Sequence, residues 1–180
     1  HRELAEYGST FNILLRNNIH IVNNVDFDYN GIRFIFSTLW SKIDKINEKD
    51  IVQSVADFNA ISIRGKKLKV SDYNQMHDES LSFLKQSLAD SVQKMVVVTH
   101  HLPSCLCNSE IHKGSKINEA FCVDLTNFIG TCKANFWIYG HSHFNQKPLI
   151  IGDTILLTNQ LGMIQSNEHF SFRSNAFFSI

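Results

Sequence analysis

The chain has 180 residues, a length that suits a single domain, and its 17 basic residues balance its 17 acidic ones. This balance argues against a nucleic-acid-binding protein, because such proteins usually carry a basic stripe. The one basic run, Arg64–Lys69, suits a solvated loop. No apolar stretch approaches the roughly 20 residues that a membrane-spanning helix needs. We therefore expect one domain, residues 1–180, with no nucleic-acid partner and no membrane partner.

The four cysteines have neither the spacing of a zinc knuckle nor that of a disulfide framework (Cys105, Cys107, Cys122 and Cys132). Reduced thiols that are buried as small apolar groups are the simpler interpretation. It predicts a cytoplasmic protein.

In chain order, the first expected element is a short helix that Ser9 would cap and that carries Phe11–Leu15. The Asn30-Gly31 pair then predicts a hairpin between strands Val25–Tyr29 and Ile32–Ser37, because this dipeptide favours the tight turn that joins paired strands. A helix is expected near Ile51–Phe58, followed by a loop over Arg64–Tyr73.

The clearest helix covers Tyr73–Gln93, where apolar residues recur every three or four positions. Met95–Val98 is a continuous β-branched run that predicts a buried strand. A helix over Glu119–Ile129, capped by Asn118 and stopped by Gly130, precedes a second buried strand over Phe136–Tyr139.

Another hairpin is expected between Pro148–Ile151 and Thr154–Leu157, and the last strand over Ala176–Ile180. Strands thus alternate with helices in the middle of the chain, and hairpins lie toward its ends. This order predicts an α/β protein with a mixed sheet.

Both buried strands run directly into pairs of histidines. Met95–Val98 leads into His100 and His101, and Phe136–Tyr139 leads into His141 and His143. Ligand sites lie beyond the carboxyl ends of strands in such sheets, so neighbouring strands would bring these imidazoles together. Imidazole is a ligand for Zn, Fe, Ni and related ions. The other histidines, His20, His77, His112 and His169, are expected to be structural or merely exposed.

The stretches "VVVTHHLP" and "YGHSHF" resemble the fourth and fifth motifs of the calcineurin-like metallophosphoesterase superfamily. The segment "KINEAFCVDL" between them and the region "NGIRFIFSTLW" add to the likeness, which spans most of the chain. The resemblance implies a layered α/β/β/α sandwich. It also implies hydrolysis of a small phosphorylated substrate by water activated at a two-metal centre.

By position in those motifs, His100 and His141 would bind the second metal and His143 the first. His101 would lie either just outside the metal ligands or near the substrate, and its catalytic role would be to stabilise the added charge on the phosphate. The two ions, divalent or trivalent, would be Mn, Fe, Zn or Ni. The early D-x-H and G-D motifs of the family are missing from this sequence. His1 is either the catalytic histidine of a shortened third motif or a remnant of no function. The missing motifs imply that the sandwich is incomplete at its N-terminus.

Two other functions are consistent with the same residues. The missing carboxylates would suit a non-catalytic scaffold on the same fold, which should expose an apolar patch for a protein partner. A mononuclear structural zinc site built from His100, His141 and a cysteine is the other possibility.

Overall fold

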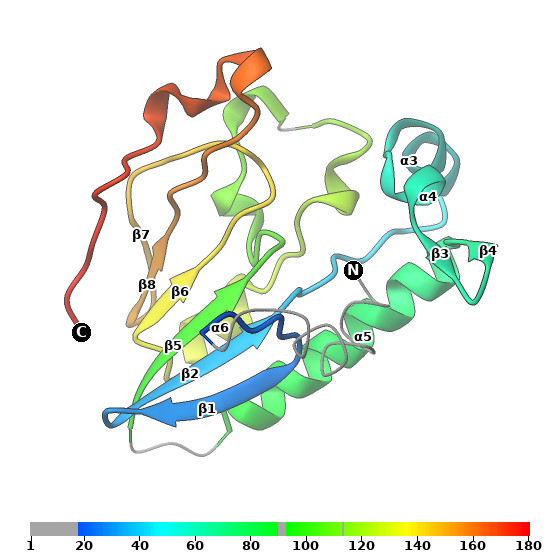
Figure 1. Cartoon of the computed structure of the whole chain (residues 1–180). Helices are drawn as coiled ribbons and strands as arrows, with labels where there is room; N and C mark the ends of the chain where they lie inside the picture. Colours follow the sequence, from blue (N-terminus) through cyan, green and yellow to red (C-terminus); the bar gives the residue numbers. More distant parts are fainter. Residues whose placement is uncertain (1–17, 90–92, 113) are drawn as a thin grey trace.

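The computed structural model describes residues 18–89, 93–112 and 114–180, and its main element is a mixed six-stranded sheet (Figure 1). The strands lie in the order β1-β2-β5-β6-β8-β7. Their bounds are β1 Val25–Tyr29, β2 Ile32–Ser37, β5 Lys94–Thr99, β6 Phe136–Ile138, β7 Leu149–Ile151 and β8 Thr154–Leu157.

The four central strands β2, β5, β6 and β8 are parallel, and each edge strand pairs antiparallel with its neighbour. The hairpin at Asn30-Gly31 is confirmed, because both residues adopt the positive φ angles, 51° and 76°, that a tight hairpin turn requires. The second hairpin is confirmed as well. A mixed α/β sheet is thus the architecture of the described residues.

Two helices cover one face of this sheet, α5 (Val70–Ser87) and α6 (Thr126–Thr131). Their side chains, with Leu88 just beyond α5, form a core with inward residues of the central strands (Leu84, Leu88, Ile129, Ile35, Val97, Trp137 and Leu156). Helix α5 begins three residues earlier than expected, because the Asp72 carboxylate accepts the Lys69 backbone N–H and so starts the helix at Val70. It ends at Ser87, before the expected end at Gln93.

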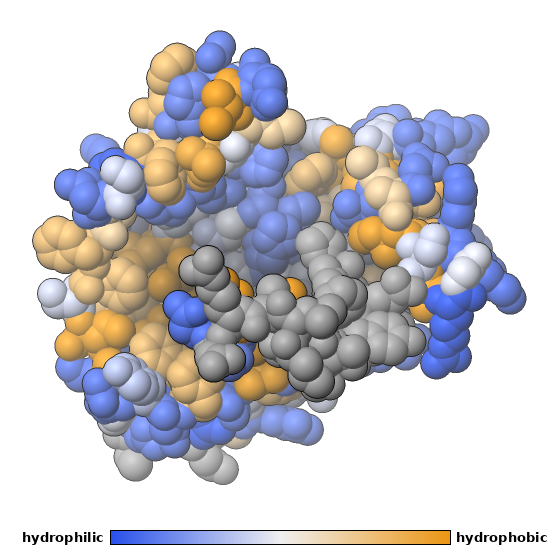
Figure 2. Space-filling model, viewed as in Figure 1, coloured by the Kyte–Doolittle hydropathy of each residue, from blue (hydrophilic) through white to orange (hydrophobic). Residues whose placement is uncertain are grey.

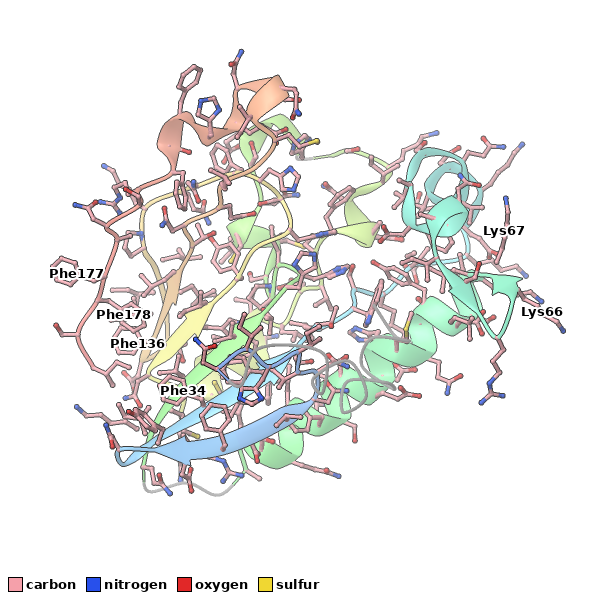
Figure 3. All side chains as sticks on the ribbon, in the orientation of Figure 1. Phe34, Lys66, Lys67, Phe136, Phe177 and Phe178 are labelled. Atoms are coloured by element: carbon pink, nitrogen blue, oxygen red, sulfur yellow. The ribbon has the colours of Figure 1, made fainter. Side chains whose placement is uncertain are left out.

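The opposite face of the sheet is apolar in every strand and is only partly buried. One row across the six strands reads Phe27, Phe34, Val96, Phe136, Ile155 and Ile150, and the next row reads Val25, Phe36, Val98, Ile138 and Leu157. Phe27 is 48% exposed and Ile150 68% exposed. Figure 3 shows Phe34, Phe136 and Phe178 lying along this side, and the Phe136 and Phe178 rings are 4.8 Å apart. Apolar residues accordingly gather on the left of the space-filling view (Figure 2).

A second, smaller core lies beyond the carboxyl end of β2. It packs α3 (Glu48–Ser54) and α4 (Asp57–Ala60) against the N-terminal half of α5. The single helix expected near Ile51–Phe58 is therefore two short helices.

The loop expected over Arg64–Tyr73 was wrong. A small hairpin, β3 (Ser62–Ile63) and β4 (Lys66–Lys67), turns at Arg64-Gly65, and Lys66 and Lys67 project from it (Figure 3).

Two further expectations were wrong. Residues Glu119–Ile129 do not form one helix, because the backbone of Phe121 and Val123 bonds to Leu102 in the loop after β5 and only a short turn and α6 remain helical. Residues Ala176–Ile180 form no strand. The helix expected around Phe11–Leu15 lies outside the described residues. Within the described ranges, no helix is long and apolar enough to cross a membrane.

Candidate metal centre

The two histidine motifs lie side by side because β5 and β6 are parallel neighbours. Beyond the strands, the Gly140 backbone N–H donates to the His100 carbonyl at 3.1 Å, which ties the two loops together. A side chain at Gly140 would have its Cβ 3.6 Å from that carbonyl oxygen. The two motifs therefore meet at one edge of the sheet, as the sequence predicted.

Three imidazoles form a group at this edge. Ligand nitrogens of His100, His101 and His141 all lie within 4.8 Å of one another, and His100 Nε2 is 3.0 Å from His141 Nδ1. Two ligand nitrogens on a tetrahedral zinc ion would be about 3.3 Å apart, given Zn–N bonds near 2.05 Å. The arrangement thus fits one ion after small side-chain shifts.

Packing holds the three rings in place. The His101 and His141 rings are stacked 4.1 Å apart, and Phe121 stacks on His141 at 5.0 Å. Trp40 lies beside the His101 ring, and only 1% of His101 is exposed.

A chain of hydrogen bonds fixes which nitrogen of His101 is free. The Tyr73 hydroxyl donates its one hydrogen to the Ala120 carbonyl at 2.8 Å. The Ser41 hydroxyl, 3.0 Å from the Tyr73 oxygen, must then donate to that oxygen. Ser41 Oγ therefore accepts from His101 Nδ1 at 2.9 Å, and His101 Nε2 keeps its lone pair. A neutral imidazole with its other nitrogen hydrogen-bonded in this way is typical of a metal ligand.

Burial also keeps these imidazoles neutral. Desolvation, and to a smaller extent the nearby His100, lower the pKa of His141 to about 4. Burial lowers the pKa of His101 well below its ordinary value. His100 keeps exposed surface, yet desolvation by the protein around its ring still lowers its pKa. All three side chains thus offer lone pairs rather than positive charges at neutral pH.

Among the residues that the structure describes, one carboxylate interacts electrostatically with this group. Asp57, at the start of α4, raises the pKa of His100, while burial raises the pKa of Asp57 itself. Asp57, Ser41 and Tyr73 were not among the site residues predicted from the sequence. Ser41 could have been noticed, since it follows β2, whose carboxyl end is next to that of β5.

His143 lies outside the group that His100, His101 and His141 form. Its Nδ1 is 2.9 Å from Glu168 Oε2, and its backbone N–H donates to Gln160 Oε1. The third imidazole of the group is thus that of His101 and not that of His143. His143 nevertheless interacts electrostatically with His100 and His141. His1 lies outside the described residues.

The third member of the group is a histidine and not the cysteine that a structural zinc site would use. Among the described residues the grouped set holds no carboxylate either. The donors present therefore suit one divalent ion of the Zn, Fe or Ni type.

Comparisons with known proteins show similarity without a described function. No protein-family model matches the chain. An uncharacterised protein of Acanthamoeba polyphaga mimivirus is 31% identical over 187 residues, which cover 94% of this chain and 65% of that protein. This chain thus spans just under two thirds of its relative. A solved structure aligns with 83% of this chain and 48% of its own at 13% identity, with a TM-score of 0.47.

Proposed function

We propose that this protein is a metal-dependent phosphoesterase that hydrolyses a small phosphorylated substrate. The observation that carries the proposal is the group of His100, His101 and His141 at the carboxyl ends of two parallel strands. A bound divalent ion there would supply a Lewis acid for the phosphate and lower the pKa of a water molecule.

The residues of this chain would share the work as follows. The three neutral imidazoles would hold the ion, and Ser41 would keep His101 Nε2 directed toward it. His143, held by Glu168, would bind the first metal of a two-metal centre, and His100 and His141 the second, as the resemblance implies. Asp57 is the described carboxylate that interacts with His100 and could complete the donor set.

Room for a substrate lies next to the ion site. A cavity of about 70 Å³ is lined by Asn118, Phe121 and Ser142, among others. Phe121 also stacks on His141, so a group in this cavity would be adjacent to the imidazoles. Amide and hydroxyl groups around an aromatic ring suit a small polar organic group attached to phosphate.

The apolar sheet face supports the layered sandwich that the resemblance implies. Eleven apolar residues form two continuous rows on the side that α5 and α6 do not cover, one across all six strands and one across five. Such a face normally packs against a second layer. We therefore propose the α/β/β/α metallophosphoesterase fold, with the second sheet layer against these rows.

A non-catalytic scaffold is the second candidate, and the same apolar face favours it. Exposed apolar area of this kind is typical of protein interaction sites. On this interpretation the imidazoles would be structural, and catalytic turnover would be absent.

Turnover by the natural protein decides between the two. We expect the protein purified from its source to hydrolyse p-nitrophenyl phosphate or bis(p-nitrophenyl) phosphate when Mn²⁺ or Zn²⁺ is added, and to stop when EDTA is added. His141→Ala should reduce kcat by about tenfold to a hundredfold or more, because it disturbs the metal site. His20→Ala, at an exposed histidine, is the matched control. No turnover with any added metal would favour the scaffold, and turnover that His141→Ala leaves unchanged would refute this site as its source.

A further inference from the structure

Two cysteines that the proposed function does not use are in direct contact. Cys105 Sγ lies 3.3 Å from Cys122 Sγ, although the residues are 17 positions apart. Cys105 is exposed and Cys122 is buried, and both are free thiols. A disulfide has an S–S distance of about 2.05 Å, so a side-chain movement of about 1.3 Å would join them.

The backbone around the two thiols is already held together. The Leu102 N–H donates to the Phe121 carbonyl, and the Val123 N–H donates to the Leu102 carbonyl, both at 3.1 Å. These bonds place the segment before Cys105 alongside the segment that carries Cys122. Backbone hydrogen bonds between the two segments therefore hold the two sulfur atoms close to each other.

We propose that Cys105 and Cys122 form an oxidisable dithiol that hydrogen peroxide converts to an intramolecular disulfide.

The chemistry proceeds in two balanced steps. The Cys105 thiolate attacks one peroxide oxygen, the O–O bond breaks, and a sulfenic acid and one hydroxide form, which takes up a proton to give water. Cys122 sulfur then attacks the sulfenic sulfur, the S–S bond forms, and the second water leaves with the thiol proton. The two sulfur atoms together lose two electrons, and the peroxide gains them.

Exposure assigns the order of the two thiols. Only Cys105 presents its side chain to solvent, so peroxide reaches it first. Burial, together with Cys105, raises the pKa of Cys122, which keeps it a thiol until the sulfenic acid forms beside it. Cys122 is thus the resolving residue.

The other two cysteines are poor competitors. Cys107 is buried, and its burial raises the pKa of its thiol to about 12. Cys132 Sγ donates to the Ile129 carbonyl at 3.3 Å in the α6 region. Neither thiol has the pairing of an exposed and a buried sulfur in contact that Cys105 and Cys122 show.

A disulfide here would close the segment from Cys105 to Cys122 into a ring beside the histidines. This segment carries Asn118 and Phe121 of the cavity wall. Phe121 also stacks on His141. Oxidation would therefore fix the position of a wall of the candidate site, whether or not the site is catalytic.

Mass spectrometry of a variant with two thiols tests the proposal. The chain contains two tryptic peptides with two cysteines each, residues 95–113 and 117–133, so cleavage alone does not identify the pair. In a Cys107→Ala, Cys132→Ala background, only Cys105 and Cys122 remain. We expect hydrogen peroxide to lower the monomer mass by about 2 Da and to link the two peptides, and dithiothreitol to reverse both changes.

The matched control adds Cys105→Ser to the same background, and it should show neither the mass loss nor the linked peptides. Peroxide treatment that leaves both thiols titratable in the folded two-thiol variant would overturn the proposal, and so would disulfide-linked dimers. If that variant does not fold, fragmentation of the linked peptides from the oxidised wild-type chain decides instead. A link through Cys107 or Cys132 in that experiment would overturn it as well.

Discussion

Replacing Ser41 with alanine should weaken zinc binding although Ser41 itself would not touch the ion. Its hydroxyl accepts from His101 Nδ1 and so keeps Nε2 as the free nitrogen. Without it, both tautomers of His101 become available. Loss of such a supporting hydrogen bond costs roughly 10-fold to 100-fold in metal affinity. Titration of the purified chain with Zn²⁺ against a chromophoric chelator measures this change.

The same substitution should lower the free energy of unfolding by about 1–3 kcal/mol, because it leaves a buried imidazole N–H without an acceptor. Urea unfolding of the metal-free chain measures this loss. Ser80→Ala is the matched control, since Ser80 is equally buried and its hydroxyl donates only to the Met76 carbonyl within α5. It should leave zinc affinity unchanged. A folded Ser41→Ala chain that binds zinc as tightly as the wild type would refute the assignment of the His101 tautomer.

Three further outcomes follow from the described packing. Burial lowers the pKa of His77 from 6.5, so in acid the unfolded chain binds a proton that the folded chain excludes. The urea midpoint should therefore fall as the pH falls from 7 to 5, and His77→Gln should reduce this fall; equal slopes for the two chains would contradict it. Gly152→Ala should destabilise the chain by more than Gly31→Ala. A Cβ at position 152 would lie 2.6 Å from the Gly130 carbonyl oxygen, whereas a Cβ at position 31 would have no atom within 4 Å. The thermal melting temperatures of the two variants measure this difference. Phe27→Lys should reduce self-association of this chain in sedimentation experiments. Val52→Lys, outside the apolar sheet face, should not reduce it. Equal effects of the two substitutions would show that the apolar sheet face is not the surface through which the chain associates.

Local patterns in the sequence were enough to predict the six strands of the main sheet and the meeting of the two histidine motifs. Asn30-Gly31 and Gly152-Asp153 fix the two hairpins of the main sheet through turn chemistry, and the β-branched run before His100 marks a buried strand. Two such strands that end in histidines were expected to be neighbours, and the parallel pairing of β5 and β6 confirms it.

Contacts with distant segments explain the failed helix and the site residues that were not predicted. The helical pattern over Glu119–Ile129 is real, but Leu102 takes the backbone bonds of Phe121 and Val123. Likewise Ser41 and Tyr73 join the site through contacts that no local spacing reveals. The helix at Tyr73 was expected, and the direction of its hydroxyl toward Ala120 was not.

The backbone of the second histidine motif is strained at both of its histidines. His141 and His143 both adopt left-handed φ angles, 73° and 55°, where a residue with a Cβ is strained by about 1 kcal/mol or more. Glycine would relieve this strain at either position. Replacing His141 with glycine would relieve this strain, but it would also remove the ring that stacks on His101 and Phe121. The stacked rings thus hold His141 in a backbone conformation that glycine would adopt without strain.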